Sequence, residues 1–134
     1  MLALVKANVL VLGCEGRSNA LKALPIRVLY RKTGLEASRS LKSESVDGVI
    51  SLWKLPDLPA GKFLRNLRLA KPYLPIIAMV DAKNIEQEIS ARSIGVTAVL
   101  NDDVSDEILK RTVVEIFRLD NAKEIQKLCV IAND

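Results

Sequence analysis

Short runs of apolar residues alternate along this chain with longer amphipathic stretches. The runs have the length of buried strands, and the longer stretches have the apolar spacing of helices. We expect strands over residues 8–12, 26–30, 48–52, 75–80 and 97–100. Strict alternation of strand and helix predicts an α/β fold, in which a parallel sheet is covered by helices on both faces.

Helices are expected after each of these strands. Pro25 ends the first after barely two turns, and Gly95 is the natural C-terminal cap of the fourth. In the fourth helix, Ile85 and Ile89 stand one turn apart on one apolar face. The expected ranges are 18–24, 35–45, 60–71, 84–93, and a last helix with an apolar stripe over 108–117 that Ser105 or Asp103 can cap.

The length of 134 residues suits one domain spanning 1–134. Apolar positions continue after Phe117, so we expect a core of about 7–118 and a helical extension over 119–134. The apolar residues that would prolong the helix are Ala122, Ile125, Leu128 and Cys129.

The composition of 49% hydrophobic and 27% charged residues is that of an ordinary soluble globular protein. No apolar run approaches the ~20 residues that cross a bilayer. The N-terminal residues have no basic segment ahead of their apolar part, so we expect no signal peptide, a cytoplasmic location and no membrane partner. Cys14 and Cys129 lie far apart and the chain has no His, which argues against a disulfide framework and a transition-metal site.

The net charge of +4 is concentrated in one stretch. Between residues 58 and 80 there is no Asp or Glu, and elsewhere the chain has 16 basic and 16 acidic residues. The cations of this stretch are Lys62, Arg65, Arg68 and Lys71. They form either a solvated helix face or a docking surface for an acidic partner. No recognition-helix motif or aromatic stacking surface accompanies them, so direct nucleic-acid binding is not expected.

The string from Asp47 to Pro56, Asp-Gly-Val-Ile-Ser-Leu-Trp-Lys-Leu-Pro, resembles the third strand and following loop of bacterial response-regulator receiver domains, which read Asp-x-Val-Ile-x-Asp-x-x-Met-Pro. Residues 75–80 and 95–100 resemble the fourth strand and the entry to the fifth, and the similarity extends over about 7–118. The resemblance implies a flavodoxin-like, doubly wound sheet of five parallel strands in the order 2-1-3-4-5, and a role in signalling.

The resemblance also identifies the positions that phosphorylation needs. Receivers carry two acidic residues after the first strand for a divalent cation, a phosphoacceptor Asp at the end of the third, a hydroxyl after the fourth and a Lys after the fifth. The matching residues here are Gly13, Cys14, Leu52, Val80 and Asp102, with Asp103 in place of the Pro that follows the Lys. Because Leu52 has no carboxylate, no acyl phosphate can form. We therefore expect a pseudo-receiver that is not an enzyme and uses no cofactor or metal.

Three alternatives at these loops stay open. The acidic residues Glu15, Asp81, Asp102 and Asp103 could gather around Mg²⁺ or Ca²⁺, although we expect Arg17, Lys54 and Lys83 to pair with them instead. Cys14 is expected to be a small, partly buried thiol, with redox sensing as the alternative; its spacing from Arg17 is too short for a phosphatase loop. Trp53 is expected to pack locally, with an exposed partner anchor as the alternative.

The leading functional hypothesis is a protein-interaction module of signal transduction or transcription regulation that acts without phosphorylation. Its partner is a signalling or regulatory protein, acidic if the helix cations bind it, or a second copy of the chain. In receivers the commonest such face is the fourth helix, fifth strand and fifth helix. Here that face includes Ile94, Val96, Val99, Lys110, Arg111 and Val114, and Val114 is expected to be exposed.

A homodimer on that face is expected because Ile116, Phe117, Ile125 and Leu128 offer more apolar surface than one short helix needs. The alternative function is a small flavodoxin-like enzyme or ligand-binding domain. It would use the crevice at the carboxyl ends of the strands and hold an anion or cofactor through Arg17, Lys54 or Lys83.

Overall fold

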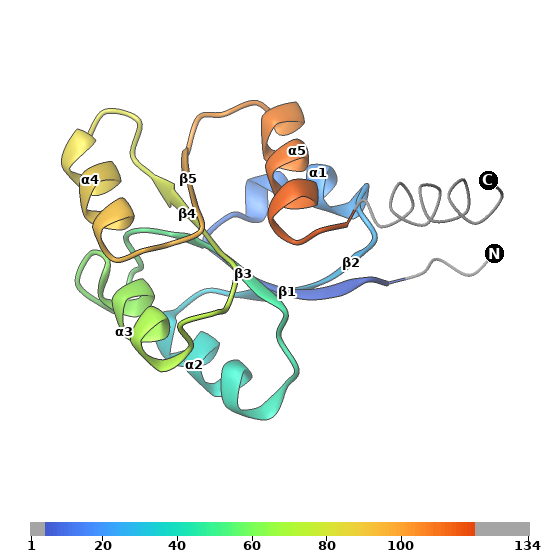
Figure 1. Cartoon of the computed structure of the whole chain (residues 1–134), viewed down its shortest axis with the longest axis horizontal. Helices are drawn as coiled ribbons and strands as arrows, with labels where there is room; N and C mark the ends of the chain where they lie inside the picture. The colour runs from blue at the N-terminus through green and yellow to red at the C-terminus, as the bar shows by residue number, and fades with distance from the viewer. Residues whose placement is uncertain (1–4, 120–134) are drawn as a thin grey trace, which may run out of the picture.

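The apolar runs of the sequence form a five-stranded sheet in the computed structural model, which describes residues 5–119 (Figure 1). The strands are β1 (Ala7–Leu12), β2 (Ile26–Arg31), β3 (Gly48–Leu52), β4 (Ile76–Val80) and β5 (Ala98–Asn101). They are ordered β2-β1-β3-β4-β5 and every neighbouring pair is parallel. The predicted α/β class and strand order are therefore confirmed.

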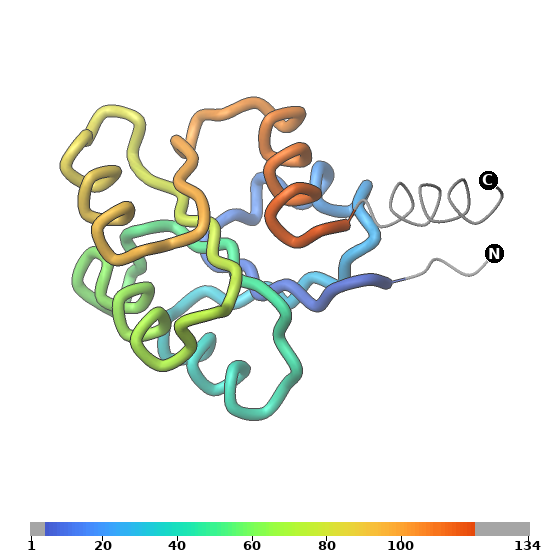
Figure 2. Tube along the Cα trace, in the orientation of Figure 1, coloured from blue at the N-terminus to red at the C-terminus, as the bar shows by residue number. Residues whose placement is uncertain are grey.

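Helices cover both faces of the sheet. They are α1 (Ser18–Lys22), preceded by a short 3-10 turn η1 (Glu15–Arg17), then α2 (Gly34–Ser43), α3 (Lys62–Ala70), α4 (Ile85–Ser93) and α5 (Asp106–Ile116). Helices α1 and α5 lie side by side on one face, and α2, α3 and α4 lie on the other (Figures 1 and 2). Within residues 5–119, no helix combines the length and the apolar character that crossing a membrane requires.

The strands are apolar on both sides because both sides are covered. In β1, Leu10 and Leu12 pack in the cluster beneath α2, α3 and α4, whereas Val9 and Val11 pack beneath α1 and α5. Successive side chains of a strand point to opposite faces, so a strand between two helical layers must be hydrophobic at every position. This is why the strands read as continuous apolar runs.

Local signals set the helix ends close to their predicted positions. The Ser105 hydroxyl accepts a hydrogen bond from the Ile108 N–H at 3.2 Å, so Ser105 rather than Asp103 caps α5. Gly95 ends α4 with φ +82°, a conformation that glycine adopts without strain.

The apolar face predicted for α4 is not buried. Ile85 and Ile89 are 71% and 56% exposed, while Ala91 is fully buried against β4 and β5. Spacing places Ile85 and Ile89 on one side of the helix but does not decide which side meets the sheet. Here Ala91, together with Ile94 just beyond the helix, makes that contact.

Helix α5 ends at Ile116, and the chain leaves the helix over residues 117–119. Arg118 has φ +55°, and the Leu119 N–H then donates to the Val114 carbonyl at 2.9 Å. This closing bond and the burial of Leu119 form a Schellman-type helix end. The remaining residues of the expected extension, including Ile125 and Leu128, lie outside the described part of the chain.

Candidate functional site

The carboxyl ends of β3, β4 and β5 surround a small cleft of about 170 Å³. It lies where open α/β sheets bind their ligands. Its lining residues are Leu52, Trp53, Lys54, Met79, Asp81, Gln87 and Asp102. The fold thus brings Leu52 and Asp102 together as the resemblance implied, and Gln87 joins them from α4.

Leu52 fills space that a side chain at position 13 would need. Gly13 has φ +76°, and a Cβ built on it would lie 2.5 Å from Leu52 Cδ1. A positive φ disfavours every residue with a Cβ, and such a contact would force the leucine to move. Leu52 packs against both core clusters of the sheet. Gly13 and Leu52, which the resemblance matches to a cation-binding acid and to the phosphoacceptor, therefore fit each other.

Val80 and Asp102, at two of the other matched positions, also take part in core packing and in loop hydrogen bonds. Val80 is fully buried, and its carbonyl accepts the Asp102 N–H at 2.8 Å. Arg17 bridges to the same loop, because its guanidinium pairs with Asp106 at 2.7 Å and donates to the Asp102 carbonyl at 2.9 Å. Arg17 therefore joins the loop after β1 to the loop after β5, and its charge is matched by Asp106 instead of an anionic ligand.

Cys14 is buried, as expected for a structural thiol. Burial, reinforced by the nearby Glu15 carboxylate and opposed by Arg17, raises the pKa of the thiol to about 12. Since the thiolate is the reactive form, this cysteine is inert at neutral pH. The structure thus favours the packing role of Cys14 over redox sensing.

The residues of this region do not fit a divalent cation. Mg²⁺ and Ca²⁺ require several oxygen ligands, but Gly13 and Leu52 provide no side-chain oxygen. Across residues 5–119, no three His, Cys, Asp or Glu residues converge as a metal site would require. The proposed gathering of Glu15, Asp81 and their acidic neighbours is therefore wrong. The expected ion pairs are also wrong in part, because Arg17 pairs with Asp106 and the ion pairs within residues 5–119 include neither Lys54 nor Lys83.

Trp53 packs inside the molecule, which confirms the local role over the exposed anchor. Its side chain is 5% exposed and lies against Gly61, where the ring leaves no space for a Cβ. The Gly61 N–H donates to the Trp53 carbonyl at 2.8 Å, and Gly61 has φ +78°. Glycine at position 61 therefore allows the loop to close over the indole before α3 begins.

Asp57 fastens this loop to α2, a role that the sequence pattern did not identify. Its carboxylate accepts the N–H groups of Gly34 at 2.8 Å and Leu35 at 3.0 Å. These are orphan donors of the first turn of α2. The bond from Gly34, with that from Leu35, holds the pKa of Asp57 below its usual range. No local motif predicts it, because the donors lie more than twenty residues away in sequence.

Three of the four predicted α3 cations are exposed: Lys62, Arg65 and Lys71. Arg68 differs because its guanidinium donates to the carbonyls after the helix. The acceptors are Lys71 at 3.2 Å, Pro72 at 2.9 Å and Leu74 at 2.8 Å. Partial burial lowers the pKa of Arg68. Arg68 therefore supports the α3–β4 loop from the last turn of α3, a role that the other three cations do not share.

The face of α4, β5 and α5 also differs from expectation. Val114 is partly buried and packs against the core beneath α5, so the predicted exposed contact is wrong. Ile116 and Phe117 pack there too, and the Phe117 ring lies against Gly48. Lys110 pairs with Glu107 at 3.0 Å, whereas Arg111 is exposed. Ile94, Val96 and Val99 are partly buried and pack against the cluster under α4. The exposed apolar residues of this face are instead Ile85 and Ile89 of α4 and Ile108 of α5.

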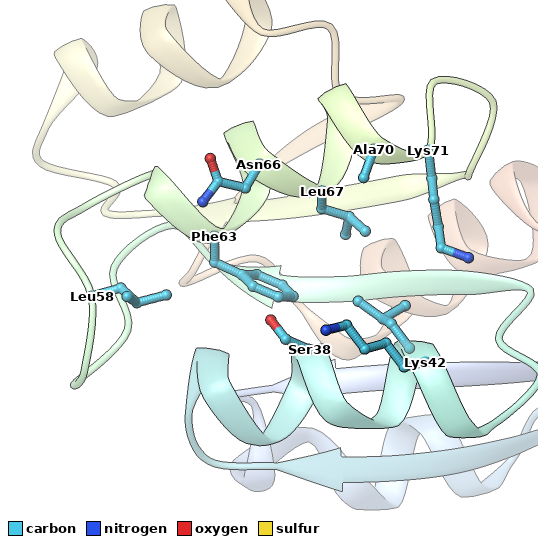
Figure 3. Close-up of a pocket in the computed structure, with 9 residues that line it drawn as sticks. Ser38, Lys42, Leu58, Phe63, Asn66, Leu67, Ala70 and Lys71 are labelled. Atoms are coloured by element: carbon cyan, nitrogen blue, oxygen red, sulfur yellow. The ribbon is translucent and has the colours of Figure 1, made fainter.

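A second hollow lies between α2 and α3, and the close-up in Figure 3 shows side chains from both helices facing into it. We call it the α2–α3 groove. Its volume is about 240 Å³. It is lined by Ser38, Leu41, Lys42, Leu58, Phe63, Asn66, Leu67, Ala70 and Lys71. Sequence reasoning identified the cations of α3 but missed Lys42 and the groove, because its two walls come from separate segments.

The fold and this cleft define the receiver-domain architecture. The signal receiver domain of an HD domain-containing protein from Pseudomonas fluorescens Pf-5 matches with a TM-score of 0.77 at 17% identity, covering 92% of this chain and 96% of that one. A response regulator receiver domain protein from Clostridium thermocellum matches with a TM-score of 0.74 at 23% identity, covering 90% and 99%.

A third similar structure contains a metal. It is the receiver domain of a sensor histidine kinase from Pseudomonas aeruginosa PAO1 with a magnesium ion coordinated in its active site cleft. The match has a TM-score of 0.72 at 19% identity and covers 83% of this chain and 97% of that one. No protein-family model matches this sequence, and the search of curated proteins gives no match. At these identities the structural matches establish the fold.

Proposed function

We propose that this protein is a receiver-like interaction module of signal transduction or transcription regulation that acts without phosphorylation and without catalysis. The observation that carries the proposal is the fit between Gly13 and Leu52. It replaces a cation ligand and a phosphoacceptor by hydrocarbon packing, in a fold whose other members include a chain with magnesium in this cleft. Without a chemical switch, the module acts through its surface, by binding a signalling or regulatory protein.

Incubation with acetyl phosphate and Mg²⁺, followed by intact-mass measurement, tests the first part of this proposal. We expect no added phosphoryl mass, because position 52 offers no carboxylate for an acyl phosphate. A receiver domain that retains its phosphoacceptor aspartate, treated in parallel, is the positive control. An acid-labile adduct of one phosphoryl group on this chain would overturn the proposal.

We also propose that α4 allows the module to form a homodimer. Ile85 and Ile89 lie one turn apart, both more than half exposed, and two such faces can meet around a twofold axis. This surface replaces the one expected from Ile116 and Phe117, which pack inward. Sedimentation velocity at several concentrations should show dimers of the full chain that the double substitution Ile85→Glu/Ile89→Glu abolishes.

The control for this experiment uses the equally exposed Leu69 and Tyr73, which lie on α3 and its following loop. Leu69→Glu/Tyr73→Glu should leave the dimer intact. A full chain that is monomeric at all concentrations would contradict the dimer proposal.

The alternative, an enzyme or ligand-binding domain that uses the cleft, is less well supported. Arg17, one of the three cations assigned to hold an anion, is paired with Asp106. The cleft of about 170 Å³ is also below the ~300 Å³ at which small-molecule pockets usually begin.

A further inference from the structure

We propose that the α2–α3 groove binds an acidic segment of a partner protein, with one large apolar side chain of that segment inserted between the helices. This inference rests on the proposed function, since it names the surface and the partner chemistry through which the module would act. Two independent observations support it, the shape of the groove and the charge around it.

The groove has an apolar floor open to solvent. Leu41, Leu58, Phe63 and Leu67 form most of its wall, and Phe63 points between the two helices (Figure 3). Its volume of about 240 Å³ lies below the ~300–1,000 Å³ of pockets that enclose a drug-sized ligand. It suits instead one anchoring side chain of a larger partner, the way in which most protein interfaces concentrate their binding energy.

The charged residues that line the groove are all positive. Its lining includes Lys42 and Lys71 but no Asp or Glu. Neither lysine takes part in the four ion pairs found within residues 5–119. Lys62 and Arg65 extend the positive charge along α3 beyond the groove, within a stretch of chain that has no acidic residue. A partner with carboxylates on either side of its apolar anchor would be complementary to this arrangement.

The extent of the charge favours a polypeptide over a small anion. A small apolar acid in the groove would be neutralised by Lys42 or Lys71, which leaves Lys62 and Arg65 without a partner, because they do not line the groove. An acidic segment that leaves the groove and crosses the exposed side of α3 can reach these cations as well. Nucleic acid is the less suitable polyanion, since Phe63, the aromatic residue of the groove, is buried and offers no face for base stacking.

Selection from a displayed library of random 16-residue peptides, with the full chain as bait, tests the proposal without assuming a partner. We expect enriched peptides to combine Asp or Glu with a large apolar residue. Fluorescence anisotropy of the best peptide should show binding that weakens as salt rises from 50 to 300 mM. Amide chemical-shift changes should map to α2 and α3.

Two pairs of matched variants locate the binding site. Ala70→Trp should fill the groove from an exposed position and weaken binding about tenfold or more, whereas Ala23→Trp, an exposed change at the C-cap of α1, should not. Lys42→Glu/Lys71→Glu should weaken binding at 50 mM salt by about tenfold or more, whereas Lys22→Glu/Arg111→Glu, on the opposite face of the sheet, should change it little. Circular dichroism of each variant verifies the fold.

Failure to enrich any peptide would overturn the inference, as would peptides that bind equally well to Ala70→Trp or that bind without acidic residues. Displacement of the best peptide by a short-chain fatty acid, with no sensitivity to Lys62→Glu/Arg65→Glu, would indicate a small-molecule site and would also overturn it. The acetyl phosphate experiment is independent of these results. An absence of phosphorylation together with no peptide binding would refute the groove proposal but not the pseudo-receiver. A phosphoryl adduct together with peptide binding would refute the pseudo-receiver but not the groove as a binding site.

Discussion

The cleft at the carboxyl ends of the strands and the α2–α3 groove are both hollows of this molecule, but they are built in opposite ways. In the cleft, Leu52 fits against a glycine backbone, and the surrounding loops are joined by Arg17 to Asp106 and to the Asp102 carbonyl. In the groove, apolar side chains lie open between two helices, and lysines stand at the surface without ion-pair partners among residues 5–119.

This difference shows where selection for function and selection for stability can act in one fold. Where a polar site is removed from a parallel α/β sheet, the vacated space must be filled, because protein interiors tolerate few voids. Hydrocarbon at position 52 together with glycine at position 13 achieves this. The groove combines apolar side chains with two exposed lysines, which is the arrangement that the proposed binding of an acidic segment requires.

The strongest test of this contrast is Gly13→Asp, which restores an acidic residue at the position of the lost cation ligand. We expect a loss of about 2–5 kcal/mol in the free energy of unfolding. About 1–2 kcal/mol comes from the positive φ and the remainder from the clash with Leu52. Urea unfolding followed by Trp53 fluorescence measures it.

Gly16→Asp is the matched control, because a Cβ at Gly16 would meet nothing within 4 Å and its φ is not positive. Gly16→Asp should lower the free energy of unfolding far less than Gly13→Asp does. Measured against Leu52→Ala alone, the double variant Gly13→Asp/Leu52→Ala should lose only the backbone part, because the clash is then absent. Equal stabilities of Gly13→Asp and Gly16→Asp would show that the cleft still has room for a ligand side chain.

A smaller effect is expected from Leu52→Asp, which restores the phosphoacceptor itself. The carboxylate would replace a partly buried leucine that packs against both core clusters, at a cost of roughly 1–3 kcal/mol. Leu52→Met, which conserves volume, should cost less than about 1.5 kcal/mol. Mg²⁺ should not restore the loss, and a clear gain in melting temperature on adding Mg²⁺ would show that a working cation pocket survives.

The sequence predicted the sheet well because burial on both faces leaves a continuous apolar run for each strand. It also indicated which strand ends meet, since a strand end is visible in the sequence and the strand order brings Leu52 and Asp102 to one cleft. The sequence could not show which side of a helix faces the sheet. Ile85 and Ile89 share a side of α4, but the competing contact of Ala91 with the sheet turns them outward.

The sequence also could not predict roles that depend on contacts between segments far apart along the chain. Arg68 counted as a surface cation until the fold placed three loop carbonyls around its guanidinium. The α2–α3 groove joins Lys42 to Lys71 across two helices, and no periodicity relates them. Val114 stands off the apolar stripe of α5, yet it is partly buried against the core cluster beneath that helix.

The smallest effect that we predict concerns the loop that separates the two hollows, through Asp57→Asn. The Asp57 carboxylate accepts N–H groups of Gly34 and Leu35 at the start of α2, and this lowers its pKa in the folded state. A lowered folded-state pKa stabilises the protein above the unfolded-state value, near 3.8, and the contribution disappears as pH falls through the folded-state pKa below it. Asp57→Asn should therefore lower the urea midpoint equally at pH 7 and pH 5, and the difference from the unmodified chain should shrink below pH 4. Asp103→Asn, an exposed change after β5, is the control for the removal of one carboxylate from the surface. A difference that persisted unchanged at pH 3 would mean that the loss in Asp57→Asn does not come from the charge, and that the charge on Asp57 does not help to hold this loop against α2.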